Sequence, residues 1–163
     1  MFILKSIKFY IDKILFFVLF LVIFAMLLCV SLQVFSRYVM KSPLVFTEEL
    51  VRFLLIWLGL LGGSYAFGVK GHIALTLFFD KCKDAVKTIA TIIIDISIFL
   101  LSLFVLIIGG LELISVTHSQ VSSVLAIPMW IVYIVLPISG IIIAFYQIYY
   151  ILLEIFNIKE EIK

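Results

Sequence analysis

The sequence predicts an all-α integral membrane protein with four transmembrane helices and short interfacial helices. The chain of 163 residues is 66% hydrophobic and 13% charged, whereas soluble domains contain about half apolar and about a quarter charged residues. The apolar residues form four long stretches, and roughly 20 such residues are needed to cross a bilayer. We therefore expect one four-span membrane domain over residues 1–163, with no soluble domain attached.

The first span is predicted at residues 14–35, after a basic segment. Lys5, Lys8 and Lys13 lie among apolar residues in that segment, which is typical of a short helix at the lipid headgroups. The apolar stretch that follows is too long for the hydrophobic region of a signal peptide, and no small-residue cleavage site follows it. We therefore expect this stretch to remain as a span.

The second span, residues 47–67, is predicted to start after a break at Ser42-Pro43. Its first turn holds Glu48 and Glu49, whose negative charge complements the helix dipole. Arg52 follows at a spacing that predicts an ion pair on one helix face. Such a pair contributes about 0.3–0.5 kcal/mol when exposed. A larger role stays open, because charges at the edge of the hydrocarbon are costly unless they pair or face protein.

Small residues in the second half of this span predict a helix-packing face. Gly59 and Gly63 form a GxxxG motif, and Gly62 and Ala66 repeat its spacing one position away. In lipid, small residues let two helix backbones approach closely. GxxxG alone is a weak signal, but four small residues within eight positions favour a helix–helix contact.

A polar connection follows the second span. Lys70, Gly71 and His72 are more typical of a helix end closed by glycine than of an anion site. Residues 73–79 are apolar but too short to cross the membrane, so we expect them at the interface.

The third span, residues 88–108, contains Asp95 about two helical turns from its start. A carboxylate at bilayer depth costs about 2.5–3.5 kcal/mol, so Asp95 should face protein, be protonated or extend toward the headgroups. It could belong to a proton or ion pathway or be a structural residue. We favour the structural role, because no second acidic or histidine residue lies deep within a span to form a relay.

The fourth span is predicted at residues 128–156. Pro128 suits a helix start, and Trp130 and Tyr133 suit the membrane interface. Pro137 lies inside the span, where it removes a backbone hydrogen bond and bends the axis.

The distribution of basic residues predicts the orientation. The first segment, the middle loop and the tail carry nine of the ten lysines. The opposite side holds Arg37, Lys41 and Arg52, and its second loop has no basic residue. Both termini are therefore expected in the cytoplasm.

No pattern in the chain indicates an enzyme, a cofactor or a metal site. His72 and His118 are predicted on opposite sides of the membrane, and no phosphate-binding loop occurs. The net charge of +2 is too small to indicate nucleic-acid binding. The spans also lack the paired, broken helices that mark a transporter's own binding site.

A set of residues spread over the chain resembles the small membrane subunit of tripartite ATP-independent periplasmic (TRAP) transporters. In the first half these residues are Gln33, Arg37-Tyr38, Thr47-Glu48-Glu49-Leu50, Arg52, Trp57, Leu61-Gly62 and Gly71-His72-Ile73. In the fourth span they are Ile127-Pro128, Trp130, Tyr133 and Pro137. The chain departs from the family pattern at Thr76, where an acidic residue is common, and at Ser139, where glycine is usual.

The resemblance implies a scaffold subunit in the bacterial inner membrane, in contact with lipids. A large permease subunit would import an organic acid (a dicarboxylate, sialic acid or sugar acid) together with sodium, and a periplasmic binding protein would deliver it. The small residues and Trp57 would pack within this chain or on the large subunit. An outward polar collar would consist of Arg37, Tyr38, Lys41, Glu48, Glu49 and Arg52.

Two other functions stay open. One is a self-sufficient, homo-oligomeric small transporter with Asp95 as its coupling residue. The other is an accessory membrane subunit of a redox complex.

Overall fold

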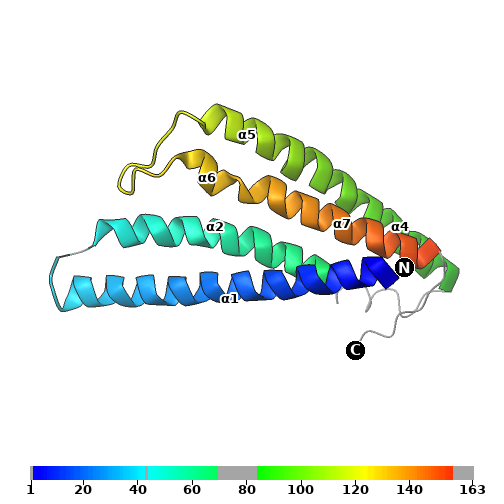
Figure 1. Ribbon diagram of the computed structural model, residues 1–163, viewed down its shortest axis with the longest axis horizontal. Coiled ribbons are helices and arrows are strands. Elements are labelled where there is room, and N and C mark those ends of the chain that lie inside the picture. Colours follow the sequence, from blue (N-terminus) through cyan, green and yellow to red (C-terminus); the bar gives the residue numbers. More distant parts are fainter. Residues whose placement is uncertain (1, 43, 70–83, 156–163) are drawn as a thin grey trace.

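The fold is all α-helical, as predicted (Figure 1). The computed structural model describes residues 2–42, 44–69 and 84–155. The helices are α1 (Phe2–Tyr38), α2 (Val45–Gly68), α4 (Asp84–Leu101), η1 (Ser102–Ile108), α5 (Gly109–Thr117), α6 (Met129–Tyr133) and α7 (Val135–Ile155). The described residues contain no β-strand, and one isolated bridge joins Val121 to Pro128.

Four of these segments are long and apolar enough to cross a membrane. They are Leu4–Tyr38, Val45–Gly68, Ile89–Thr117 and Met129–Glu154. This finding confirms the prediction of four spanning helices and corresponds to the four apolar stretches of the sequence.

The helices form two hairpins that meet along α2 and α7. The first hairpin pairs α1 with α2, and the second pairs the continuous α4–η1–α5 helix with α6 and α7. Figure 1 shows the hairpins close together at the end that holds the N-terminus and further apart toward the α5–α6 connection. We call the end with the α1–α2 turn and the α5–α6 loop the loop end, and the opposite end the terminal end.

Two helices are longer than the predicted spans. The basic segment does not form a separate interfacial helix, because α1 runs without a break from Phe2 to Tyr38. No proline or glycine interrupts it, and Lys8 donates to Asp12 one turn later at 2.8 Å. The third helix continues past residue 108 through α5 to Thr117, so Glu112 is helical. A π-helical segment, η1, joins its two parts.

The third and fourth helices pack closely around Pro137. A Cβ atom on Gly110 would lie 2.9 Å from Pro137 Cδ, and one on Gly140 would lie 2.8 Å from Ile107 Cγ1. The fourth helix is interrupted at Ile134 between α6 and α7. This break lies three residues before Pro137, consistent with the backbone bond that proline removes.

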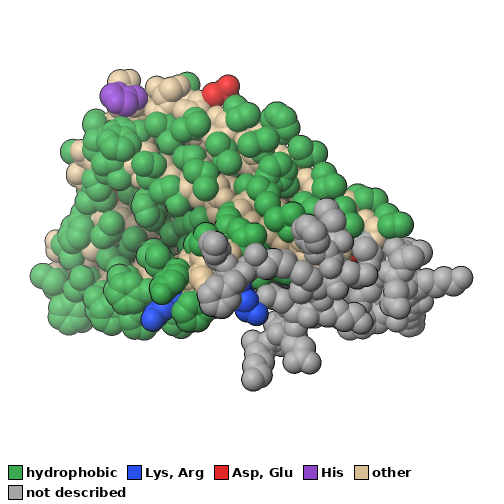
Figure 2. Space-filling model, turned by 45° about the vertical axis from the view of Figure 1, so that its right-hand side comes forward, with side chains coloured by type: hydrophobic (Ala, Val, Ile, Leu, Met, Phe, Trp, Pro, Cys, Tyr) green, Lys and Arg blue, Asp and Glu red, His purple; other side chains and the backbone are tan. Residues whose placement is uncertain are grey.

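The buried core is small and centred on α7. Val135 and Tyr146 are fully buried, and they form a cluster with Leu15 of α1 and Leu61 of α2. Large apolar side chains elsewhere are exposed, and Figure 2 shows one face of the molecule covered mostly by hydrophobic side chains. A lipid-facing surface explains this pattern, because apolar side chains need no cover from hydrocarbon.

Candidate functional site

Helix α2 packs against α6 and α7 along one of its faces, which we call the closed face. The face consists of Trp57, Leu61, Ser64 and Gly68, spaced at four, three and four residues. The Trp57 indole donates from Nε1 to the Val132 carbonyl oxygen at 3.1 Å. Leu61, Ser64 and Gly68 are buried. Trp57 is therefore a contact between the two hairpins of this chain.

Gly68 ends the closed face in a cluster of polar contacts at the terminal end. A Cβ atom on Gly68 would lie 2.6 Å from Tyr146 Cζ, so the two helices touch here. The Tyr150 hydroxyl donates to the Gly68 carbonyl oxygen. The Tyr146 hydroxyl donates to Asp12 Oδ1 at 2.5 Å, and Lys8 donates to Asp12 Oδ2 at 2.8 Å. Helices α1, α2 and α7 are thus joined at one point.

The sequence interpretation missed this cluster. Asp12 lies four residues after Lys8, and this spacing would have predicted their ion pair. No local pattern predicts the contact between Asp12 and Tyr146, because 134 residues separate them.

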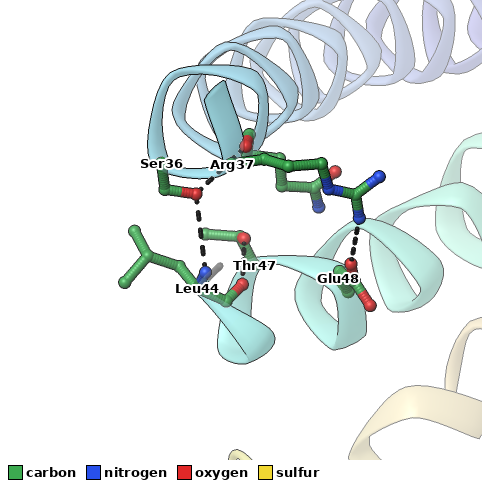
Figure 3. A network of polar contacts seen from close by, with 6 residues as sticks. Ser36, Arg37, Leu44, Thr47 and Glu48 are labelled. Atoms are coloured by element: carbon green, nitrogen blue, oxygen red, sulfur yellow. Dashed lines mark hydrogen bonds and ion pairs between the residues drawn. The ribbon is translucent and has the colours of Figure 1, made fainter. Parts of the chain in front are cut away.

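A second face of α2 contacts α1. A Cβ atom on Gly62 would lie 3.9 Å from Leu19 Cδ2, and the Tyr65 ring lies 6.4 Å from the Phe16 ring. Ser36 and Thr47, both buried, form the turn between the helices (Figure 3). The Leu44 amide donates to Ser36 Oγ at 3.4 Å, and Thr47 Oγ1 donates to the Leu44 carbonyl oxygen at 2.7 Å.

A third face of α2 has no neighbour in the described ranges of the chain, and we call it the open face. Its residues are Arg52, Leu55, Gly59, Gly63 and Ala66. Gly59 is two residues from Trp57 and from Leu61 of the closed face. Two residues correspond to a rotation of about 200° around a helix with 3.6 residues per turn, so the open face points away from the closed face. Cβ atoms placed on Gly59 and Gly63 would have nothing within 4 Å. The predicted small-residue stripe is therefore divided, with Gly62 beside α1 and the others on the open face.

The charged residues of the loop end pair differently from the prediction. Arg37 donates to Glu48 Oε1 at 3.0 Å, as Figure 3 shows. Glu49 Oε2 accepts hydrogen bonds from the Val124 and Leu125 amides at 3.1 and 2.8 Å. The predicted ion pair of Arg52 with Glu48 or Glu49 is wrong. Helix spacing allowed that pair, but the tertiary fold brings other donors to both carboxylates.

Glu49 holds the α5–α6 loop against the start of α2. The loop is closed within itself by the Ser122 amide, which donates to the Ile127 carbonyl oxygen at 2.9 Å. Ala126 has a positive φ of 51°, a backbone conformation that residues other than glycine rarely adopt. The carboxylate thus fixes an unusual loop conformation. The other residues of the predicted collar, Tyr38 and Lys41, are exposed at the α1–α2 turn.

The remaining predicted residues lie elsewhere. Asp95 is half-buried on α4. Gly71 and His72 lie outside the described residues. His118 stacks on Trp130 with ring centroids 6.5 Å apart. In the part of the chain that the structure describes, no group of three or more histidine, cysteine or acidic residues could hold a metal ion.

Sequence comparison identifies the family. The sequence model described as "Tripartite ATP-independent periplasmic transporters, DctQ component" matches residues 26–157. The chain belongs to the DctQ family. The predicted resemblance to the small TRAP subunit is thereby confirmed.

Two relatives of this DctQ chain have a similar length. A TRAP transporter small permease protein of Haemophilus influenzae is 26% identical over 140 residues, which cover 86% of both chains. The sialic acid TRAP transporter small permease protein SiaQ of Vibrio cholerae is 24% identical over 142 residues, covering 83% of this chain and 76% of SiaQ. The chain is thus similar to small permease subunits of membrane transporters.

A third relative is much longer. The isethionate TRAP transporter permease protein DctMQ of Oleidesulfovibrio alaskensis is 32% identical over 123 residues. These residues cover 71% of this chain but 19% of DctMQ, so the chain spans about a fifth of that permease. In DctMQ a segment like this one belongs to the same polypeptide as the rest of the permease. Small TRAP permease subunits accordingly work beside a large permease subunit.

Proposed function

We propose that this chain is a scaffold subunit that binds a large permease subunit through the open face of α2. One observation carries the proposal: Gly59 and Gly63 form a GxxxG motif whose Cβ positions have nothing within 4 Å. In a bilayer such a motif supports close packing of another helix. No described part of this chain occupies the face, and in this proposal a helix of the large subunit packs there.

The long DctMQ relative supports the choice of partner. A segment similar to this chain is joined there to the remainder of a permease. Covalent joining keeps the two parts side by side, and a separate small subunit needs a non-covalent interface instead. The open face provides a helix surface of suitable shape.

The complete transporter, in this proposal, imports an organic acid together with sodium. The large subunit binds and moves the solute, and a periplasmic binding protein delivers it. The relatives named for sialic acid and isethionate both handle organic acids by name. A dicarboxylate, a sialic acid or a sugar acid is the solute class we propose here.

We also propose that the loop end faces the periplasm of a bacterial inner membrane. Lys5, Lys8 and Lys13 lie at the terminal end, whereas Arg37 and Lys41 lie at the loop end. Lys87 of α4 and five lysines outside the described residues add to the basic residues on the terminal side of the predicted topology. The positive-inside rule then places both termini in the cytoplasm.

The test replaces Gly59 and Gly63 with leucine and measures recovery of this chain with a tagged large subunit. Two leucines on the open face would separate the helix backbones, so we expect most of the recovery to be lost. Ser31→Leu is the matched control, because Ser31 is exposed on α1. Recovery of the double variant at the level of the control would contradict the proposed interface.

A further inference from the structure

Arg52 is a cation that has no partner among the described residues. Both carboxylates at helical spacing from it are engaged, since Glu48 accepts from Arg37 and Glu49 accepts from the Val124 and Leu125 amides. Among the described side chains Arg52 makes no hydrogen bond and no ion pair, and it is exposed. The guanidinium is therefore available to a group outside this chain.

The position of Arg52 places that group beside the open face. Arg52 lies three residues before Leu55 and seven before Gly59, so the three share one side of α2. Leu55 is 56% exposed. A helix packed on Gly59 and Gly63 would continue past Leu55 toward the guanidinium.

The chemistry of arginine indicates what lies there. A charge at the edge of the hydrocarbon is costly unless it is paired or faces protein. The planar guanidinium donates two parallel hydrogen bonds to a carboxylate, which gives both strength and a fixed geometry. A lipid phosphate could also accept from it, but the adjoining face is the one assigned to protein.

We propose that Arg52 pairs with a carboxylate of the large permease subunit at the loop end of the open face. The proposal rests on the function proposed above and names the chemistry of the partner. The glycines allow a helix to approach at any position along the face, whereas a single ion pair fixes its position along the axis. Arg52 is thus the residue that sets the register of the two subunits.

The first experiment measures recovery of Arg52→Glu with a tagged large subunit in the co-expressed complex. Two carboxylates would then face each other, and we expect recovery to fall about tenfold. Arg52→Gln removes the charge without repulsion and should reduce recovery less. Lys41→Glu is the matched control, because it makes the same charge change at an exposed position of the loop end. Thermal unfolding of each variant purified alone confirms that it folds, and Arg52→Gln replaces Arg52→Glu if the latter does not.

The second experiment identifies the partner by charge reversal. In the Arg52→Glu background, each acidic residue near the periplasmic membrane edge of the large subunit is changed to arginine, one at a time. Restored recovery with one of these changes supports the proposal. If Arg52→Glu is recovered normally, or if no change restores it, the carboxylate pairing is wrong and Arg52 contacts lipid instead.

The glycine variants separate the two proposals. Loss of recovery with leucine at Gly59 and Gly63, combined with normal recovery of both Arg52 variants, would retain the interface and remove only the ion pair. Normal recovery of the glycine variants would remove the interface itself.

Discussion

The closed and open faces of α2 lie on opposite sides of one helix and use glycine in different ways. On the closed face, a Cβ atom on Gly68 would lie 2.6 Å from Tyr146 Cζ. On the open face, the Cβ positions of Gly59 and Gly63 have nothing within 4 Å. Of these three glycines, the one that packs within the chain is thus Gly68, which lies outside the GxxxG motif. A small-residue motif in a membrane helix indicates that close approach is allowed, and the fold decides which glycines are already in use.

The largest effect on the folded chain should come from adding a methyl group to the closed face. Gly68→Ala would push Cβ into the Tyr146 ring, and overpacking of this kind lowers the free energy of unfolding by about 1–3 kcal/mol. Thermal unfolding of the purified chain in detergent measures the loss.

Gly63→Ala is the control for this change, because the same methyl group meets open space there. We expect the free energy of unfolding of this control to change by less than about 0.5 kcal/mol. Equal effects of the two substitutions would show that the two faces do not differ in packing.

The next effect should come from the contact that joins α7 to α1 beside Gly68. Tyr146→Phe removes the hydroxyl that donates to Asp12 and should cost about 1–2 kcal/mol of unfolding free energy, because the acceptor is a carboxylate. Tyr133→Phe is the control, since the Tyr133 hydroxyl makes no hydrogen bond with any described residue.

A double-mutant cycle with Asp12→Asn sharpens this measurement. If the two side chains act through their shared hydrogen bond, the double variant should lose less than the sum of the single variants. Strict additivity would show that Tyr146 stabilises the terminal end by packing alone.

The smallest of the three effects should come from Trp57, at the end of the closed face nearer the loop end. Trp57→Phe keeps an aromatic ring but removes the donor to the Val132 carbonyl oxygen, and hydrogen bonds between membrane helices contribute about 0.6 kcal/mol on average. Trp130→Phe is the matched control, because no described residue accepts a hydrogen bond from its indole. A larger loss at Trp130 would show that Trp57 does not join the hairpins.

The four spans and the family followed from local sequence. Hydrocarbon thickness sets the length of an apolar stretch, so the stretches were visible without any knowledge of their packing. The helix start after Pro128 also depends on neighbouring residues alone. The length of α1 was not predicted. The basic segment before residue 14 has the composition of a separate interfacial helix, but it continues into the first span without a break.

Local sequence alone determined that this chain is an integral membrane protein with four spanning helices and a small-residue stripe on the second helix. The tertiary structure alone decided that Gly62 faces α1, that Gly59 and Gly63 face outward, and that Glu48 pairs with Arg37. It also brought Asp12 to Tyr146 and Glu49 to the α5–α6 loop. These contacts join residues 11 to 134 positions apart. Helix periodicity predicts which side chains can pair within one helix. The hydrogen-bond donors that bind Glu48 and Glu49 come from other segments, and only the tertiary fold brings them close.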